Sequence, residues 1–256
     1  MTATLPAWLA DIPAEQPHPL VFATVSGAHL YGFPSADSDV DLRGVHLLPL
    51  PEIVGLRHGP ETITHSWERH GVEVDLVTHD LAKFCRLLLS RNGYVLEQLL
   101  SPLVVATSPL HRELAEAAPA CLTSHHAHHY LGFARTQWRL FEGTSELKPL
   151  LYTFRVLLTG IHLMRTGEVV ADLTRLQEGG PSYLPELVAA KQAAEHGLLP
   201  DGAPEHAVLA ADVAALTAEL ERAREDSRLP AVAAGQELVH EIVVRARLGG
   251  RAGMPS

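Results

Sequence analysis

Short apolar segments separated by turn-forming residues dominate the first part of the chain. Residues 20–25 form an apolar, β-branched run, and the turn formers Gly27 and Gly32 follow it. Residues 39–48 carry a second run that is apolar at most alternate positions. Residues 72–77 alternate strictly, with apolar side chains on one face and mainly acidic ones on the other. The pattern therefore predicts three strands, with a turn and a short helix or loop between the first two.

Helical spacing of apolar residues replaces this strand pattern along the rest of the chain. Asp80 is suited to cap a helix over residues 81–89, and Asn92-Gly93 is expected to close that helix. Beyond Pro109, helical patterns occur at residues 110–117, 126–141, 147–166, 206–226 and 233–248. The sequence thus predicts an α/β (α+β) fold, with a small mixed-sheet domain at residues 1–108 and an all-helical domain at residues 109–256.

Charge and composition narrow the class of protein. The formal net charge is −10, whereas proteins that coat nucleic acid non-specifically neutralise its phosphates with Lys and Arg. A local basic groove is still compatible with this balance. Prolines and acidic residues interrupt the first 20 residues, so we expect neither a signal peptide nor a membrane span, and a cytoplasmic location. The two cysteines form no CxxC pair and are expected to be core thiols.

Asp39 and Asp41 carry the most specific chemistry in the sequence. They stand two residues apart in a predicted strand, so both carboxylates project from one face and can share Mg²⁺ ions about 3.5–4 Å apart. Hard carboxylate oxygens suit Mg²⁺, and phosphoryl transfer needs such charge neutralisation. Gly27 permits a tight turn whose N–H groups can hold a phosphate. Asp75 is costly to bury in an apolar strand unless a shared metal partners it, and Glu73 on the same face is the reserve candidate.

The order of these residues resembles a known signature. The chain reads Gly27-Ala28, ten residues, then Asp39-Val40-Asp41, with Asp75 on a later strand. This is similar to nucleotidyltransferases of the DNA polymerase beta superfamily, in which Gly-Ser, a spacer of similar length and Asp-x-Asp precede a third carboxylate. The segment SGAHLYGFPSADSDVDLRGV resembles more closely the predicted nucleotidyltransferases associated with RNA repair, and the likeness continues through VDLVTHDLAKF, NGYVLEQLLSP, HHYLGFARTQ and LKPLLYTFRVLLTGIHLMRTG. The resemblance implies that the three aspartates are catalytic and bind the metal.

Ala28 is the departure from this signature, because the family has a serine whose hydroxyl helps to hold the nucleotide phosphates. Loss of one neutral hydrogen bond costs about 0.5–1.5 kcal/mol, which would weaken nucleotide binding without abolishing it. Ser26, Gly27, Ala28 and His29 form the predicted nucleotide-binding turn, although the Ser26 side chain is expected to point away. Arg43, on the face of Asp41, is expected either to form a structural ion pair or to touch a phosphate.

One face of the predicted helix at residues 147–166 carries a set of polar side chains. Lys148, Tyr152, Arg155, Thr159 and His162 recur at the spacing of a single helix face. Two interpretations stay open. The face is either solvated, or Lys148 and Arg155 meet nucleotide phosphate or the acceptor while Tyr152 stacks on a base.

Together these features predict an enzyme that uses Mg²⁺ to move a nucleoside monophosphate from an NTP to an acceptor hydroxyl. RNA is the acceptor that the resemblance implies, and the sequence leaves a small-molecule or protein hydroxyl open. The alternative is a non-catalytic nucleotide- or RNA-binding protein with a degraded nucleotidyltransferase fold, which Ala28 supports. The sequence indicates neither the base preference nor the oligomeric state.

Overall fold

The chain forms two compact units in a computed structural model that describes residues 5–193 and 197–249. Unit 1 comprises Met1–Gly27, Asp39–Cys121 and Ala233–Ser256, and unit 2 comprises Ala28–Ser38 and Leu122–Val232. The units are therefore interleaved along the sequence, since residues 28–38 belong to the second unit and the C-terminal helix belongs to the first.

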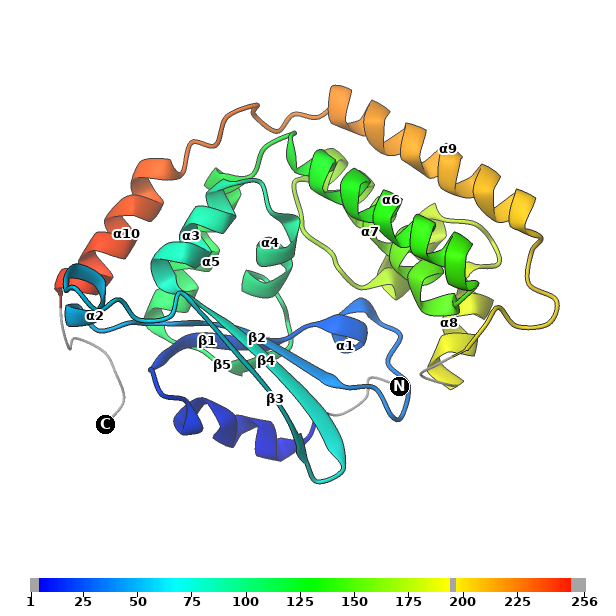
Figure 1. Ribbon diagram of the computed structural model, residues 1–256. Coiled ribbons are helices and arrows are strands. Elements are labelled where there is room, and N and C mark those ends of the chain that lie inside the picture. The colour runs from blue at the N-terminus through cyan, green and yellow to red at the C-terminus, as the bar shows by residue number, and fades with distance from the viewer. Residues whose placement is uncertain (1–4, 194–196, 250–256) are drawn as a thin grey trace. The chain divides into compact units, whose positions relative to one another are not determined.

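Unit 1 is built on a five-stranded mixed sheet with the strand order β3-β4-β2-β1-β5 (Figure 1). β2 and β4 are parallel, and the other three strand pairs are antiparallel. A tight hairpin at His70 and Gly71, both with positive φ, joins β3 to β4. The strands are β1 (Leu20–Val25), β2 (Val40–His46), β3 (Thr62–Arg69), β4 (Val72–Asp80) and β5 (Val104–Ala106). The central parallel pair brings segments far apart in sequence side by side.

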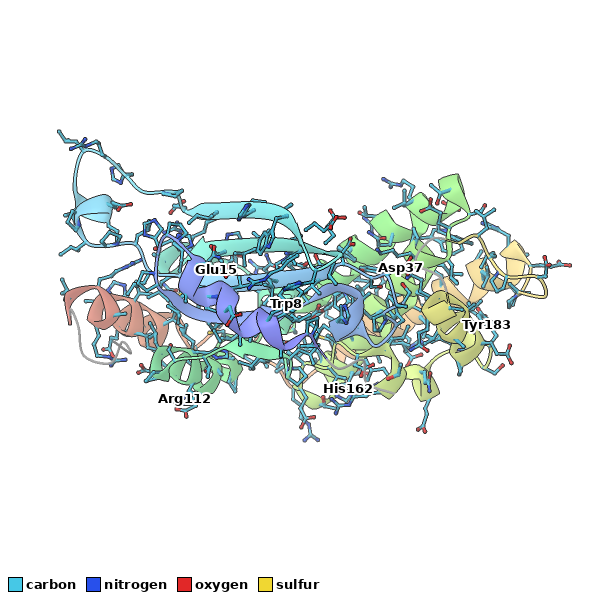
Figure 2. All side chains as sticks on the ribbon, turned by 90° about the horizontal axis from the view of Figure 1, so that it is seen from below. Trp8, Glu15, Asp37, Arg112, His162 and Tyr183 are labelled. Carbon is cyan, nitrogen blue, oxygen red and sulfur yellow. The ribbon has the colours of Figure 1, made fainter. Side chains whose placement is uncertain are left out.

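One face of the sheet is covered by the 3₁₀ helix η1 (Ala7–Glu15). Figure 2 views the molecule from this side, with Trp8 and Glu15 marking the helix. Leu9 and Ile12 are buried in a core that the alternate apolar residues of the three central strands complete, namely Val25, Val40, Leu42, Val74 and Leu76. Burial of every second strand residue on this face leaves the intervening residues, Asp41 and Asp75 among them, on the opposite face.

The opposite face is partly covered by α3 (Leu81–Leu89), α4 (Gly93–Leu99) and α5 (Pro109–Cys121) (Figure 1). Phe22 of β1 contacts Phe84 of α3 and His111 of α5, with ring centroids 5.4 and 4.4 Å apart. Asp80 caps α3 by accepting a hydrogen bond from the Ala82 N–H, 2.9 Å away. α3, α4 and α5 thus pack on this face of the sheet, between β1 and the end of β4.

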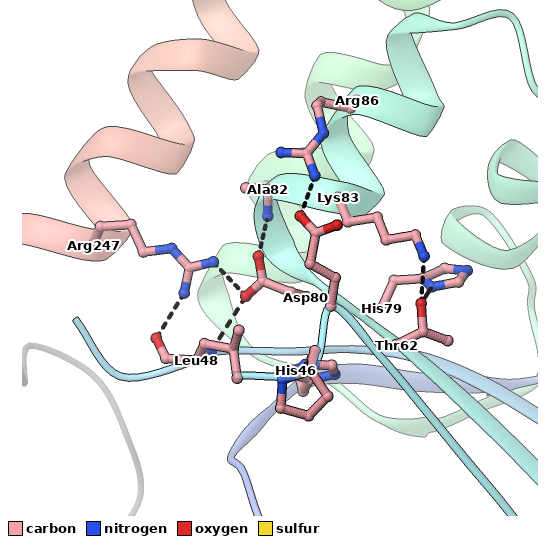
Figure 3. Close-up of polar contacts among 11 residues, drawn as sticks. His46, Leu48, Thr62, His79, Asp80, Ala82, Lys83, Arg86 and Arg247 are labelled. Atoms are coloured by element: carbon pink, nitrogen blue, oxygen red, sulfur yellow. Dashed lines mark hydrogen bonds and ion pairs between the residues drawn. The ribbon is translucent and has the colours of Figure 1, made fainter. Parts of the chain in front are cut away.

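Unit 1 is completed by the short α2 (Pro51–Val54) and by α10 (Gln236–Leu248), which packs against α3 and α5. Arg247 of α10 donates to the Asp80 carboxylate and, over 2.8 Å, to the Leu48 carbonyl (Figure 3). The side chains of this ion pair are only 9% and 5% exposed. The C-terminal helix is therefore tied to the sheet by a buried charge pair.

Unit 2 is helical, and α7 is its central element. α7 (Leu147–Thr166) is buried around most of its circumference because α6 (His126–Thr144), α9 (His206–Glu225) and α8 (Leu184–Ala193) all pack against it. The short 3₁₀ turns η2 (Leu173–Arg175) and η3 (Gln177–Gly179) lie between α7 and α8. α1 (Gly27–Tyr31) begins at Gly27, which belongs to unit 1, and its remaining residues belong to unit 2.

The α/β fold class is confirmed, and β1 and α3 have the predicted bounds. Asn92 and Gly93 begin α4 instead of closing α3, because the Asn92 side chain caps the Tyr94 N–H. The sequence pattern missed η1, α2, β3, β5 and α8. The functional division at residues 1–108 and 109–256 stays a prediction, and the contact-defined units differ from it by placing α5 and α10 with the sheet.

Both cysteines are core thiols. Cys85 and Cys121 are buried, and burial raises the pKa of the Cys85 thiol to about 12 and that of the Cys121 thiol to about 11. The start of α6 contains the fully buried His126, whose ring contacts the Thr123 hydroxyl at 3.2 Å. The helix start is therefore packed against the loop before it.

Candidate active site

The site in unit 1 is centred on two carboxylates that face each other across the parallel strand pair. Asp41 of β2 is in direct register with Asp75 of β4, so the side chains project from the same face. Their side chains are 29% and 33% exposed, which leaves both carboxylates accessible to a ligand. Strand alternation predicted that each acid would avoid the core, but only the strand order makes them neighbours.

Arg43 lies between these two carboxylates. Its guanidinium donates to Asp41 Oδ1 over 2.6 Å and to Asp75 Oδ2 over 3.1 Å. It also donates to the backbone carbonyls of Leu42 and Asp75. Of the two roles open from the sequence, the structure shows the ion pair. The pair holds a positive charge at the point where the two acids converge.

Ser66 and Tyr94 complete the surroundings of this ion pair, and the sequence analysis singled out neither. Ser66 of the edge strand β3 donates its hydroxyl proton to Asp75 Oδ1 over 2.8 Å. Burial lowers the pKa of Arg43, but contact with Tyr94 and the charges of Asp41 and Asp75 outweigh it and raise the pKa above its ordinary value. Arg43 therefore stays charged. Ser66 escaped notice because it lies on a polar strand that gives no apolar pattern.

Gly27 explains the tight turn beside Asp41. Its φ is +61°, and a Cβ built on it would lie 1.9 Å from Asp41 Oδ2. Any other residue would strain the backbone and also displace the carboxylate. The preceding N–H, that of Ser26, donates to the Asp41 carbonyl over 2.8 Å, which fixes the turn against β2. The Ser26 hydroxyl is buried, and among the described residues no hydrogen-bond partner is found for it.

Asp39 and Glu73 occupy the rim of the same face. Asp39 is exposed and immediately precedes β2, so it lies just outside the strand in which it was expected. Glu73 is exposed on the face of β4 that carries Asp75, two residues nearer the hairpin. The residue in register with Asp41 is Asp75, so the geometry favours Asp75 over Glu73 as the third carboxylate.

A divalent cation fits the chemistry of this donor set. In the described part of the chain, no group of three or more His, Cys, Asp or Glu side chains is arranged to hold a metal ion. Two converging carboxylates are nevertheless present, and their hard oxygens suit Mg²⁺. Arg43 pairs with Asp41 Oδ1 and Asp75 Oδ2, so a cation would bind through Asp41 Oδ2, which lies beside Gly27. Asp41 would therefore hold the ion, with Asp39 at the rim and Asp75 opposite Asp41.

The polar face of α7 belongs to unit 2, and it is not solvated. Arg155 is 2% exposed, and its guanidinium lies 3.8 Å from the ring centroid of Tyr31. Tyr152 meets Tyr31 edge to face, with ring centroids 5.3 Å apart, and Thr159 is fully buried. The solvated-face interpretation was therefore wrong. A role of Lys148, Tyr152 and Arg155 toward nucleotide stays a prediction, as do the roles of Ala28 and His29 in the adjoining turn.

These features define a class of protein, the polymerase beta-type nucleotidyltransferases, and comparison with known proteins agrees. Residues 1–244 match the model of the family described as the RNA repair pathway DNA polymerase beta family. The chain belongs to this family. Nucleotidyltransferases of the polymerase beta type generally use divalent metals.

Individual relatives add little about function. Over 160 residues the chain is 32% identical to the uncharacterized protein MJ0002 of Methanocaldococcus jannaschii, an alignment that covers 60% of this chain and 64% of that protein. A nucleotidyltransferase-like protein from Exiguobacterium sibiricum has a crystal structure that matches 92% of this chain and 77% of its own, with 15% identity and a TM-score of 0.29. No helix in the described residues is long and apolar enough to cross a membrane.

Proposed function

We propose that this protein transfers a nucleoside monophosphate from an NTP to an acceptor hydroxyl, with Mg²⁺ as the cofactor and RNA as the acceptor. The observation that carries the proposal is the in-register pair Asp41 and Asp75 beside the glycine turn. A structural sheet has no need to place two carboxylates opposite each other, because like charges in directly paired positions are destabilising. Membership of an RNA repair family supports RNA as the acceptor.

The residues of unit 1 have distinct parts in this reaction. The turn at Ser26 and Gly27 receives the triphosphate, and Asp39 and Asp41 would hold the cation that accompanies it. When bound, Mg²⁺ neutralises the charge that develops on the phosphate oxygens. Arg43 orients the two inner carboxylates through its paired donors.

Asp75 acts on the acceptor. The acceptor oxygen forms a bond to the α-phosphorus, the bond from that phosphorus to the bridging β-phosphate oxygen breaks, and pyrophosphate leaves. The proton of the acceptor hydroxyl passes to the Asp75 carboxylate. The hydroxyl of Ser66 and the guanidinium of Arg43 hold one oxygen of Asp75 each, which fixes the carboxylate for this transfer.

A non-catalytic nucleotide- or RNA-binding role is the second candidate, and two observations favour it. Ala28 stands where the family signature has a serine. Arg43 already neutralises Asp41 and Asp75 without any cation. Both candidates require nucleotide or RNA binding, so only turnover separates them.

Transfer of label from an α-³²P-labelled NTP, with Mg²⁺ and with or without an RNA oligonucleotide, tests the proposal. The wild-type protein is expected to label the RNA, and the variant Asp41→Asn to lose this activity while keeping its thermal unfolding temperature. Asp11→Asn is the matched control, because Asp11 is an exposed acid that pairs with Arg69 on the η1 side of the sheet. Nucleotide binding without any labelled product, over the four NTPs, would establish the binding protein instead.

A further inference from the structure

A polar strip extends from the acid pair along β3 and β4 on the same face of the sheet. Thr62, Thr64 and Ser66 alternate on β3, in register with His79, Val77 and Asp75 of β4. Thr64 and Ser66 are exposed, and no carboxylate belongs to the strip between Asp75 and His79. The acidic residues Glu68 and Glu73 lie at the opposite, hairpin end of the two strands. The strip is thus an uncharged, hydroxyl-lined surface that begins at the candidate catalytic carboxylates.

The far end of this strip carries Lys83, from the first turn of α3 (Figure 3). Its ammonium is half-buried and donates to the Thr62 hydroxyl oxygen. Within residues 5–193 and 197–249, the ion pairs do not include Lys83, whereas the neighbouring Arg86 pairs with Glu61. Lys83 is therefore a positive charge at the end of the strip that is not paired with a carboxylate among the described residues.

His79 lies beside Lys83 at the same end of the strip. The Thr62 hydroxyl oxygen accepts from Lys83 and is 3.0 Å from His79 Nδ1, so Thr62 contacts both side chains. Burial, followed by the charges of Lys83, His46 and Arg43, lowers the pKa of His79, so the imidazole is neutral at neutral pH. Lys83 therefore offers a charged donor, and the neutral His79 ring and the Thr62 hydroxyl are the polar groups beside it.

The position of this group relative to the glycine turn indicates which substrate it meets. Gly27 lies at the start of β2, beside Asp41, whereas His79 lies four residues beyond Asp75 toward the end of the parallel strand β4. Four strand residues span roughly 13 Å. In-line displacement places the leaving pyrophosphate and the attacking hydroxyl on opposite sides of the α-phosphorus. With the triphosphate at Gly27, an acceptor that lies along the uncharged strip would approach from the side of Lys83.

We propose that Lys83, His79 and Thr62 form a subsite that binds a backbone phosphate of the RNA acceptor a few nucleotides from its reacting hydroxyl. This inference rests on the proposed function, since it takes the Gly27 turn as the NTP end of the site. The strip of Thr64 and Ser66 then accommodates the intervening nucleotides, and its lack of carboxylates avoids repulsion of their phosphates.

The test is the affinity of the full chain for a fluorescein-labelled single-stranded 12-nucleotide RNA, measured by fluorescence anisotropy at several salt concentrations. The wild type is compared with the variants Lys83→Gln, Lys83→Arg and Arg112→Gln. Lys83→Gln is expected to weaken RNA binding roughly tenfold, the lower end for a hydrogen bond to a charged group. It is also expected to reduce the salt slope by about 0.7, the loss of one phosphate contact on a single strand. Lys83→Arg keeps the charge and is expected to retain most of the affinity.

Arg112→Gln is the matched control, because it removes one exposed positive charge from α5 of the same unit (Figure 2). Arg112→Gln is expected to change neither the RNA affinity nor the salt slope. Equal RNA affinity and salt slope for Lys83→Gln and the wild type would overturn the subsite. A parallel titration with Mg²⁺ and a non-hydrolysable ATP analogue keeps the two proposals apart. Loss of analogue binding in Lys83→Gln would assign Lys83 to the nucleotide and overturn the acceptor subsite, whereas absence of analogue binding in the wild type would count against the proposed function itself.

Discussion

At the scale of single residues, the site depends on close approach and register. Gly27 is required because Asp41 Oδ2 occupies the space of a Cβ, and Asp75 is distinguished from Glu73 by its register with Asp41. Alternation of apolar and acidic residues was enough to predict that Asp75 faces away from the core. An ion pair of Arg43 was one of its two expected roles, but its second partner Asp75 and the Ser66 contact could not be predicted, because both depend on which strands are neighbours.

The contrast between Asp75 and Glu73 gives a prediction. Asp75→Asn keeps the side-chain volume but removes the proton acceptor, so NTP transfer is expected to fall by at least about a hundredfold while NTP affinity changes little. Glu73→Gln removes a charge from the same face of the same strand and is expected to leave transfer within about twofold. Single-turnover rates and calorimetric NTP titrations of both variants measure this. A greater loss of transfer in Glu73→Gln would give the third-carboxylate role to Glu73.

Ala28 is the residue on which the alternative function depends most. Ala28→Ser supplies the hydroxyl of the family signature and is expected to tighten NTP binding by about 0.5–1.5 kcal/mol, or roughly two- to tenfold. Ala28→Val, which adds bulk but no hydroxyl, is the control and is expected to give no gain. Calorimetric titration with NTP and Mg²⁺ measures all three proteins. Equal affinities for the serine variant and the wild type would show that Ala28 is not a lost phosphate ligand.

At the scale of elements, the sequence was informative where an element buries a regular apolar face. β1 and α3 meet this condition, and α3 also has the Asp80 cap that was expected. β3 lies at the edge of the sheet with mostly exposed polar residues, so its pairing with β4 leaves no apolar period to recognise. η1 is a 3₁₀ helix that contains Pro13, and a proline lacks the backbone N–H on which a regular helical pattern depends. β3 and η1 were missed for the same reason, because tertiary contacts and not a local apolar pattern define these two elements.

The attachment of α10 to the sheet gives a prediction at this scale. Arg247→Met leaves the Asp80 carboxylate buried with only backbone N–H donors, and such a loss typically costs about 3–5 kcal/mol. Arg245→Met is the control on the same helix, because the Arg245–Glu113 pair is 60% and 40% exposed and is expected to contribute less than about 1 kcal/mol. Urea unfolding of both variants measures the difference. Equal stabilities would show that the buried pair does not anchor α10.

At the scale of the whole molecule, composition and contacts divide the chain differently. The change from strand to helix patterns after Pro109 suggested consecutive domains, yet α5 and α10 pack with the sheet, and residues 28–38 belong to the helical unit. A change in the spacing of apolar residues shows whether an element is a strand or a helix, but not which elements it packs against. The interleaving of the two units could therefore not be predicted from the sequence. The family match over residues 1–244 includes residues of both units. The family match therefore concerns both units, while the paired carboxylates Asp41 and Asp75 lie in unit 1.

Asp41 is proposed to help bind the divalent cation that accompanies the NTP. Electron paramagnetic resonance of Mn²⁺, titrated into the protein with a non-hydrolysable NTP analogue, tests it without any assumption about the acceptor. We expect bound Mn²⁺ in the wild type and in Asp11→Asn, and an affinity lower by at least roughly tenfold in folded Asp41→Asn. Mn²⁺ binding of equal strength in all three proteins would contradict it.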